Sequence, residues 1–137
     1  MKLNIKDSGG VTVLLIKILR KEDSEGWLQA SCDFNYQGFK AHFSFSSMLN
    51  DFFPFYDQLQ TLYQTLSGKA VYLNIERNIE LTFLADGLGH ILIKGELRHT
   101  NNPYLIISFQ IDTDQTFLPE IIRECKEIIE QPRNYLK

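Results

Sequence analysis

Residues 27–46 read WLQASCDFNYQGFKAHFSFS and predict a β-hairpin. Apolar or small side chains occupy every second position in each half of this stretch, which is typical of strands that bury one face. Tyr36-Gln37-Gly38 separates the halves, and glycine adopts the positive φ that tight turns need. We therefore expect antiparallel strands over 27–35 and 39–46.

Further strands flank this hairpin in the sequence. They are rich in β-branched and aliphatic residues and are bounded by turn signals such as Arg77-Asn78 and Asp86-Gly87. The predicted segments are 11–19, 70–76, 79–85, 89–97 and 104–112, with a loop over 100–103 before the last of them.

The hydrophobic period changes to that of a helix in two places. The first apolar stripe consists of Leu49, Phe52, Tyr56, Leu59, Tyr63 and Leu66. Ser47 is its expected N-cap, Gly68 its expected C′ residue, and Pro54 predicts a kink or break near Phe53. The second stripe consists of Leu118, Ile121, Ile122, Cys125, Ile128 and Ile129. Asp112 or Asp114 should cap this helix, with Gln115 completing a capping box after Asp112, and Pro132 should end it.

These elements predict an α+β fold. Six to seven strands form a largely antiparallel sheet in the order β-β-β-α-β-β-β-β-α, and both helices pack on one face. The chain has 137 residues, a common size for one hydrophobic core, so we expect residues 1–137 to form a single domain.

Composition narrows the class of partner. The net charge of −3 argues against a protein that binds nucleic acid by neutralising phosphates, and it favours a basic protein partner. No secretory signal or membrane-spanning run of apolar residues is present, which predicts a cytoplasmic protein. Cys32 and Cys125 lack neighbouring Cys or His ligands, so we expect both thiols to be buried as small apolar side chains.

Catalytic and metal-binding patterns are missing from the sequence. His42, His90 and His99 stand on different elements and form no paired motif, so neither a metal nor another cofactor is expected. The G-x-G at 87–89 joins two strands and has no helix N-terminus with which to bind phosphate. We expect a binding protein and no enzyme.

The sheet face away from the helices is the predicted partner-binding surface. Its expected contact residues are Trp27, Asp33, His42, Tyr72, Asn74, Glu76, Lys94, Glu96 and Gln110, with Gln29, Thr82 and Ser108 on the same face. Trp27 and Tyr72 are the strongest candidates for partner contact. Exposed aromatic side chains lower solubility unless something covers them, and they often dominate interfaces. Loops, a second copy or a partner could supply that cover.

The sequence also resembles the WapI-type immunity proteins of bacteria over most of its length. Apolar and glycine positions carry the resemblance: Trp27-Leu28-Gln29-Ala30, Phe34, Tyr36, Gly38-Phe39, Phe43-Ser44-Phe45, Leu49, Phe52, Leu59, Leu62-Tyr63, Leu66, Gly68-Lys69-Ala70, Gly89-His90-Ile91, Gly95, Asp114-Gln115 and Leu118. The resemblance implies a cytoplasmic protein that binds and neutralises a cognate toxin domain, and it implies no catalytic residues.

Two other functions remain open at this stage. The sheet could curl into a small-molecule pocket lined by aromatic side chains such as Phe43, Phe83 and Phe109. Alternatively, the protein could be an enzyme of unfamiliar type, with His42, Glu76 and Glu96 acting together as its active site across the sheet face.

Overall fold

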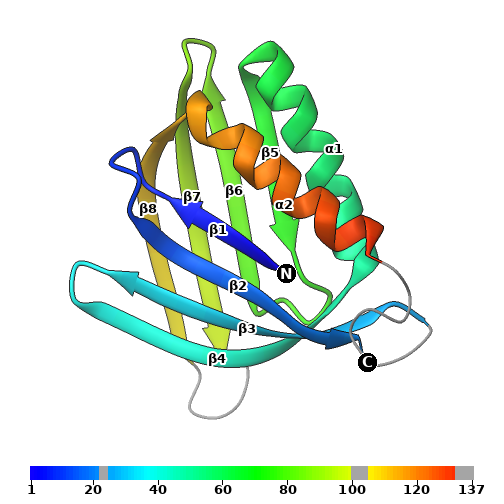
Figure 1. The fold of residues 1–137 in the computed structure, drawn as a ribbon. Coiled ribbons are helices and arrows are strands. Elements are labelled where there is room, and N and C mark those ends of the chain that lie inside the picture. Colours follow the sequence, from blue (N-terminus) through cyan, green and yellow to red (C-terminus); the bar gives the residue numbers. More distant parts are fainter. Residues whose placement is uncertain (22–24, 100–104, 132–137) are drawn as a thin grey trace.

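The strands lie in two four-stranded antiparallel sheets, as Figure 1 shows. The structure is a computed structural model and describes residues 1–21, 25–99 and 105–131. Sheet A contains β1 (Lys2–Lys6), β2 (Thr12–Lys21), β3 (Trp27–Tyr36) and β4 (Phe39–Met48). Sheet B contains β5 (Ser67–Leu73), β6 (Ile79–Asp86), β7 (His90–His99) and β8 (Leu105–Asp114). Each sheet is a meander in sequence order, so sequential hairpins account for every strand pair in it.

The hairpin between β3 and β4 forms as the sequence predicts. Its ladder runs from the pair Trp27 and Met48 to the pair Tyr36 and Phe39. Gln37 and Gly38 make the turn with φ of 50° and 87°. Positive φ at both central residues suits the right-handed twist of the flanking strands.

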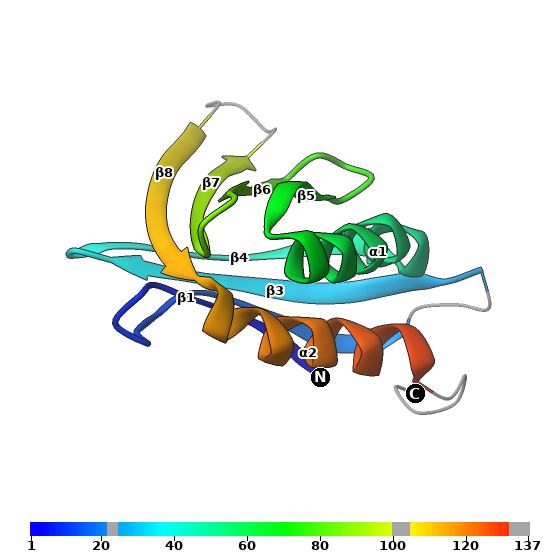
Figure 2. The same cartoon turned by 90° about the horizontal axis from the view of Figure 1, so that it is seen from above.

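Two helices close one side of the space between the sheets (Figure 2). The first helix, α1 (Leu49–Thr65), connects sheet A to sheet B and packs along β5. The second, α2 (Leu118–Glu130), follows β8 through the short 3₁₀ turn η1 (Gln115–Phe117) and packs against α1 and β1. The strands of sheet A run across those of sheet B in Figure 1, so the helices fill a corner that crossed sheets leave open.

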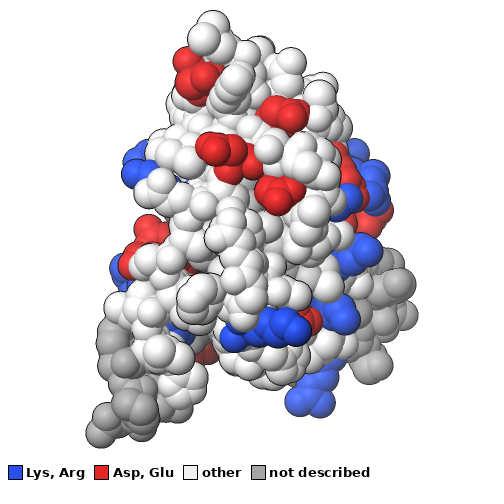
Figure 3. Space-filling model, turned by 90° about the vertical axis from the view of Figure 1, so that its left-hand side faces the viewer, with Lys and Arg blue, Asp and Glu red and all other residues white. Residues whose placement is uncertain are grey.

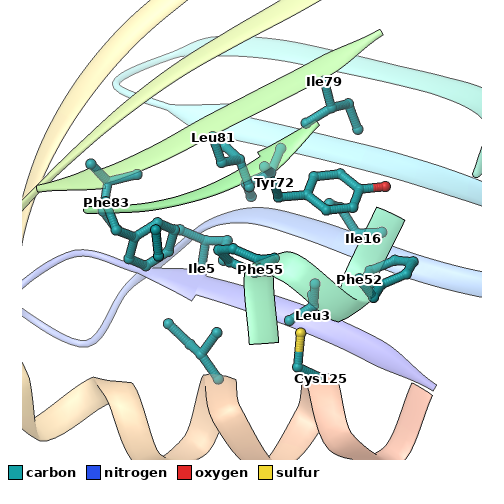
Figure 4. Packing of buried hydrophobic residues seen from close by; sticks show 14 of the residues in the cluster. Leu3, Ile5, Ile16, Phe52, Phe55, Tyr72, Ile79, Leu81, Phe83 and Cys125 are labelled. Carbon is teal, nitrogen blue, oxygen red and sulfur yellow. The ribbon is translucent and has the colours of Figure 1, made fainter. Parts of the chain in front are cut away.

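The core lies where the inner faces of both sheets meet these helices (Figure 4). The ring of Phe55 on α1 packs edge-on against Tyr72 and Phe83, with centroid separations of 5.9 and 5.6 Å. All three side chains are fully buried. Cys32 and Cys125 are buried free thiols, as expected, and burial raises the pKa of each to about 12. Both thiols therefore behave as small apolar side chains.

The α+β class and the antiparallel pairing are confirmed, while the number and grouping of the strands differ from the prediction. The described chain has eight strands in two sheets, because β1 was missed and α1 separates the two meanders. The predicted loop over 100–103 and Pro132 lie outside the described residues.

The ends of α1 also differ from the prediction. Met48 is the N-cap, and its N–H donates to the Asp51 carboxylate at 2.7 Å. The helix ends at Thr65 and its C-cap, Leu66, has a φ of 55°, so Gly68 belongs to β5 and is not the C′ residue of the helix. Pro54 lies inside one continuous helix, and the predicted break does not occur.

The turn before α2 agrees with the prediction in part. Asp114 caps η1 by accepting the N–H of Thr116 at 2.8 Å. The hydroxyl of Thr116 also donates to this carboxylate and, as the main cause, keeps the pKa of Asp114 below its usual range. Gln115 donates its N–H to Gly89 and does not complete a capping box with Asp112.

Candidate protein-binding surface

The outer face of sheet B contains a hollow of about 490 Å³, which we call the sheet B hollow. Its lining residues come from three adjacent strands: Glu80, Thr82, Lys94, Gly95, Glu96, Ser108, Phe109 and Gln110. Strand register arranges the polar side chains in two rows. One row is Thr82, Lys94 and Gln110, and the other is Glu80, Glu96 and Ser108. Inner-facing neighbours such as Leu81 and Ile93 are fully buried, so these strands present a polar outer face and an apolar inner face.

Arg98 fixes the acidic row of the sheet B hollow. Its Nη2 donates to the carboxylates of Glu80 and Glu96 at 2.7 and 2.5 Å, and its Nη1 donates to the Arg77 carbonyl at 3.3 Å. The hydrogen bond to Glu80 is the largest cause of a pKa for Arg98 above its ordinary value. Because the planar guanidinium holds both carboxylates, this row is already ordered before any partner arrives.

Lys94 is the free charge of the same surface. Its side chain is exposed, and it forms no ion pair or hydrogen bond with any residue that the structure describes. The hollow therefore combines an ordered acidic row with one available ammonium group, a pattern that can orient a polar partner surface.

Three of the predicted contact residues converge in the sheet B hollow. Lys94, Glu96 and Gln110 line it, together with Thr82 and Ser108, which the sequence also placed on this face.

Four other predicted contact residues lie elsewhere. Asp33 and His42 form a cross-strand pair on the outer face of sheet A, with Oδ1 and Nδ1 2.5 Å apart. Glu76 lines a separate hollow of about 260 Å³ between β4 and the ends of the sheet B strands. Trp27 is half-buried at the start of β3. The predicted residues thus do not form one continuous face, because the strands belong to two sheets.

Tyr72 and Asn74 were predicted to face outward, and this is wrong. Both side chains are fully buried. The Tyr72 hydroxyl is 2.8 Å from the Ser47 hydroxyl, and burial raises the pKa of the phenol above its usual value. The Asn74 amide accepts the Ile79 N–H at 2.9 Å and donates to the Ser46 carbonyl at 3.0 Å. Each polar group has an internal partner, which is what allows burial.

Glu80 and Arg98 were missed as surface residues. Both follow the alternation already recognised on their strands, since Glu80 lies two positions before Thr82 and Arg98 two positions after Glu96. Extending the period by one step at each site would have placed both residues on the outer face, although not shown their contact.

The alternative functions find little geometric support. Phe83 packs inside the core against Phe55, and the Phe109 ring packs against Phe34 with a centroid separation of 4.8 Å. Phe43 and Phe109 line different hollows, and none of the hollows described in this part of the chain is lined by all three predicted aromatic residues.

The three residues of the enzyme hypothesis, His42, Glu76 and Glu96, also lie apart. Glu76 and Glu96 line separate hollows, and His42 lines a third, between β4 and the adjoining ends of β7 and β8. Among the described residues, no three His, Cys, Asp or Glu side chains gather in a group that could hold a metal ion. Neither helix of the described chain is long and apolar enough to cross a membrane.

The protein has an α+β fold with two crossed sheets, and the sheet B hollow presents ordered polar groups on a sheet face. A polar surface of this kind can contact another macromolecule. A model of the immunity protein WapI-like family matches residues 3–133, and the chain belongs to this family. Comparison with curated proteins and with solved structures gave no match.

Proposed function

We propose that this protein binds a cognate toxin domain and neutralises it by direct protein–protein contact. Membership of the immunity protein WapI-like family, over residues 3–133, is the observation that carries the proposal. The net charge of −3 favours a basic toxin surface. Contact would take place in the cytoplasm.

The sheet B hollow is the proposed centre of this contact. Its ordered carboxylates need no rearrangement to meet a partner, because Arg98 already holds Glu80 and Glu96. Preorganised charged groups give specificity and raise association rates. A stable complex buries roughly 800 Å² on each partner, so the contact extends beyond the hollow to neighbouring residues of β6, β7 and β8.

Growth of cells that express a toxin together with this protein tests the function, and a toxin encoded by a neighbouring gene is the first to try. Co-expression of the wild-type protein should restore growth. Continued killing at equal expression of both proteins, with the immunity protein folded, would show that the proposed function is wrong.

The location of the interface is tested separately with a charge reversal. Lys94→Glu removes the exposed ammonium group of the hollow and puts a carboxylate opposite the partner group that this ammonium would contact, so it should weaken toxin binding about tenfold or more. The matched control is Lys17→Glu, which reverses another exposed lysine on the outer face of sheet A. Binding by both variants at wild-type affinity would move the interface away from the sheet B hollow while leaving the proposed function intact.

A further inference from the structure

Two of the four sheet edges are covered by helices. On the β5 edge, the Gln58 side chain of α1 accepts the Val71 N–H at 2.8 Å. On the β1 edge, the Glu124 side chain of α2 accepts the Asn4 N–H at 3.0 Å. Each helix thus bonds directly to a backbone group that an uncovered strand would expose. Such covering prevents the edge from pairing with another chain.

Charged side chains and one side-chain hydrogen bond protect the β4 edge from pairing with a second strand. Lys40 is exposed on this edge strand, as is His42 beside Asp33. Near the other end of the strand, Asn74 donates to the Ser46 carbonyl. Charged side chains on an edge oppose pairing with a second strand.

The β8 edge lacks both kinds of protection over most of its length. Ser8 donates its N–H to the Asp112 carbonyl at 2.8 Å, so the β1–β2 turn covers only the end of this edge. Backbone groups of alternate residues point to the same side of a strand. Ile106, Ser108 and Gln110 therefore direct their N–H and C=O groups to the free edge, where no described residue bonds to them.

The side chains of this open edge are suited to strand pairing. Residues 105–111 read LIISFQI and contain no charge, proline or glycine. Leu105 and Ile106 are large apolar residues with 59% and 43% of their surfaces exposed. Figure 3 looks onto this side of the molecule, and uncharged side chains make up most of its centre. An exposed uncharged edge of this length is a template for another strand.

We propose that β8 pairs with the β8 strand of a second copy, forming an antiparallel homodimer. The uncharged residues 105–111 favour pairing with another uncharged strand, and β8 of a second copy is such a strand. A two-fold axis at Ser108 would place Ile106 opposite Gln110 of the second copy and bring no like charges into direct opposition. The resulting eight-stranded sheet would carry both sheet B hollows on one face.

The mass of the purified protein in solution tests this proposal. Light scattering or sedimentation should give a mass rising with concentration toward twice 15.9 kDa, over a range of roughly 1 μM to 1 mM. Ile106→Pro removes a pairing N–H, and Ile106→Lys adds a charge while keeping the backbone donor. Each should weaken dimerisation tenfold or more.

Ser44→Lys on the β4 edge is the matched control and should dimerise as the wild type does. Circular dichroism identifies any variant that fails to fold, and Ile106→Lys is the variant expected to keep the native fold. A wild-type protein that stays monomeric throughout the range would overturn the proposal. So would dimerisation that folded Ile106→Lys leaves unchanged. Neither result bears on toxin neutralisation, because the mass is measured without toxin.

Discussion

Side chains between the two sheets are more deeply buried on the side that the helices cover than on the side left uncovered. On the covered side, the α1 side chains Phe52, Phe55 and Leu59 are fully buried. Away from the helices, burial decreases along both remaining edge strands. Exposure rises from 5% at Phe45 to 74% at Phe39 on β4, and from 2% at Ile111 to 59% at Leu105 on β8. The inner faces of the two sheets therefore separate toward solvent where no helix fills the space between them.

This difference separates the stabilising part of the molecule from the part available to partners. Buried apolar area supplies most of the free energy of folding, and here it is concentrated between the helices and the inner sheet faces. The β8 edge and the sheet B hollow lie outside this packing. Substitutions on the two sides should therefore have different effects on stability.

The largest loss of stability is expected for Phe55→Ala. The removed ring contacts Tyr72 and Phe83 inside the core, so the variant should lose about 3–5 kcal/mol of unfolding free energy. Urea denaturation measures this loss. Phe53→Ala on the same helix is the control, because Phe53 is 42% exposed and should cost less than about 1 kcal/mol. Equal losses would contradict the assignment of the core to this face of α1.

Gly95→Ala should have the next largest effect. A Cβ at this position would lie 2.2 Å from a ring carbon of Phe109, so the ring must move. Phe109 belongs to the uncovered strand β8 and is only half-buried, which allows it to yield. We expect a loss of about 1–3 kcal/mol in thermal or urea unfolding. A loss as large as that of Phe55→Ala would show that the uncovered side is as tightly packed as the helix-covered side.

Glu124 should make stability depend on pH at the covered β1 edge. The residue is 2% exposed, and burial raises the pKa of its carboxyl above the ordinary 4.5. The protonated form therefore contributes stability below the ordinary pKa, and this contribution is lost as pH rises through the raised value. Glu124→Gln should remove that dependence and give a gain on the order of 1 kcal/mol at neutral pH. Urea unfolding of the wild type and the variant near pH 4 and near pH 8 measures this gain. A difference in unfolding free energy between the two proteins that is the same at both pH values would contradict the explanation.

The smallest stability effect is expected for Gln58→Ala at the covered β5 edge. The lost bond to Val71 lies at the surface, so the cost should be about 0.5–1 kcal/mol. Hydrogen exchange of the Val71 amide should accelerate, while that of the Asn4 amide, bonded to Glu124, should not change. Unchanged exchange at Val71 would show that Gln58 does not protect this edge.

The alternation of residues 27–46 was sufficient to predict their strands. Every second side chain is buried over most of β3, and from Ala41 onward every second side chain of β4 is less exposed than its neighbours. Alternation could not show which polar residues find partners inside the protein. Tyr72 and Asn74 are buried because Ser47, Ser46 and Ile79 lie beside them, and the contacts with Ser46 and Ser47 join distant segments.

The division into two sheets could not be derived from periodicity either. Each strand predicts its own buried face, but the pairing partner depends on where α1 places the chain after β4. Strand β1 was missed because it is only five residues long. The candidate surface was predicted in part, since Lys94, Glu96 and Gln110 do meet in one hollow. Arg98 was overlooked because its importance depends on the distance to Glu80, which lies on the neighbouring strand.

Chemical-shift mapping by NMR would test toxin recognition by the sheet B hollow most directly. The isotope-labelled protein would be titrated with the unlabelled toxin domain that it neutralises in the growth test. The largest amide shifts should fall on the strand segments that carry Glu80, Lys94 and Gln110, with small shifts on the outer face of α2. Binding that shifts α1 and α2 and leaves these strand segments unchanged would contradict the account.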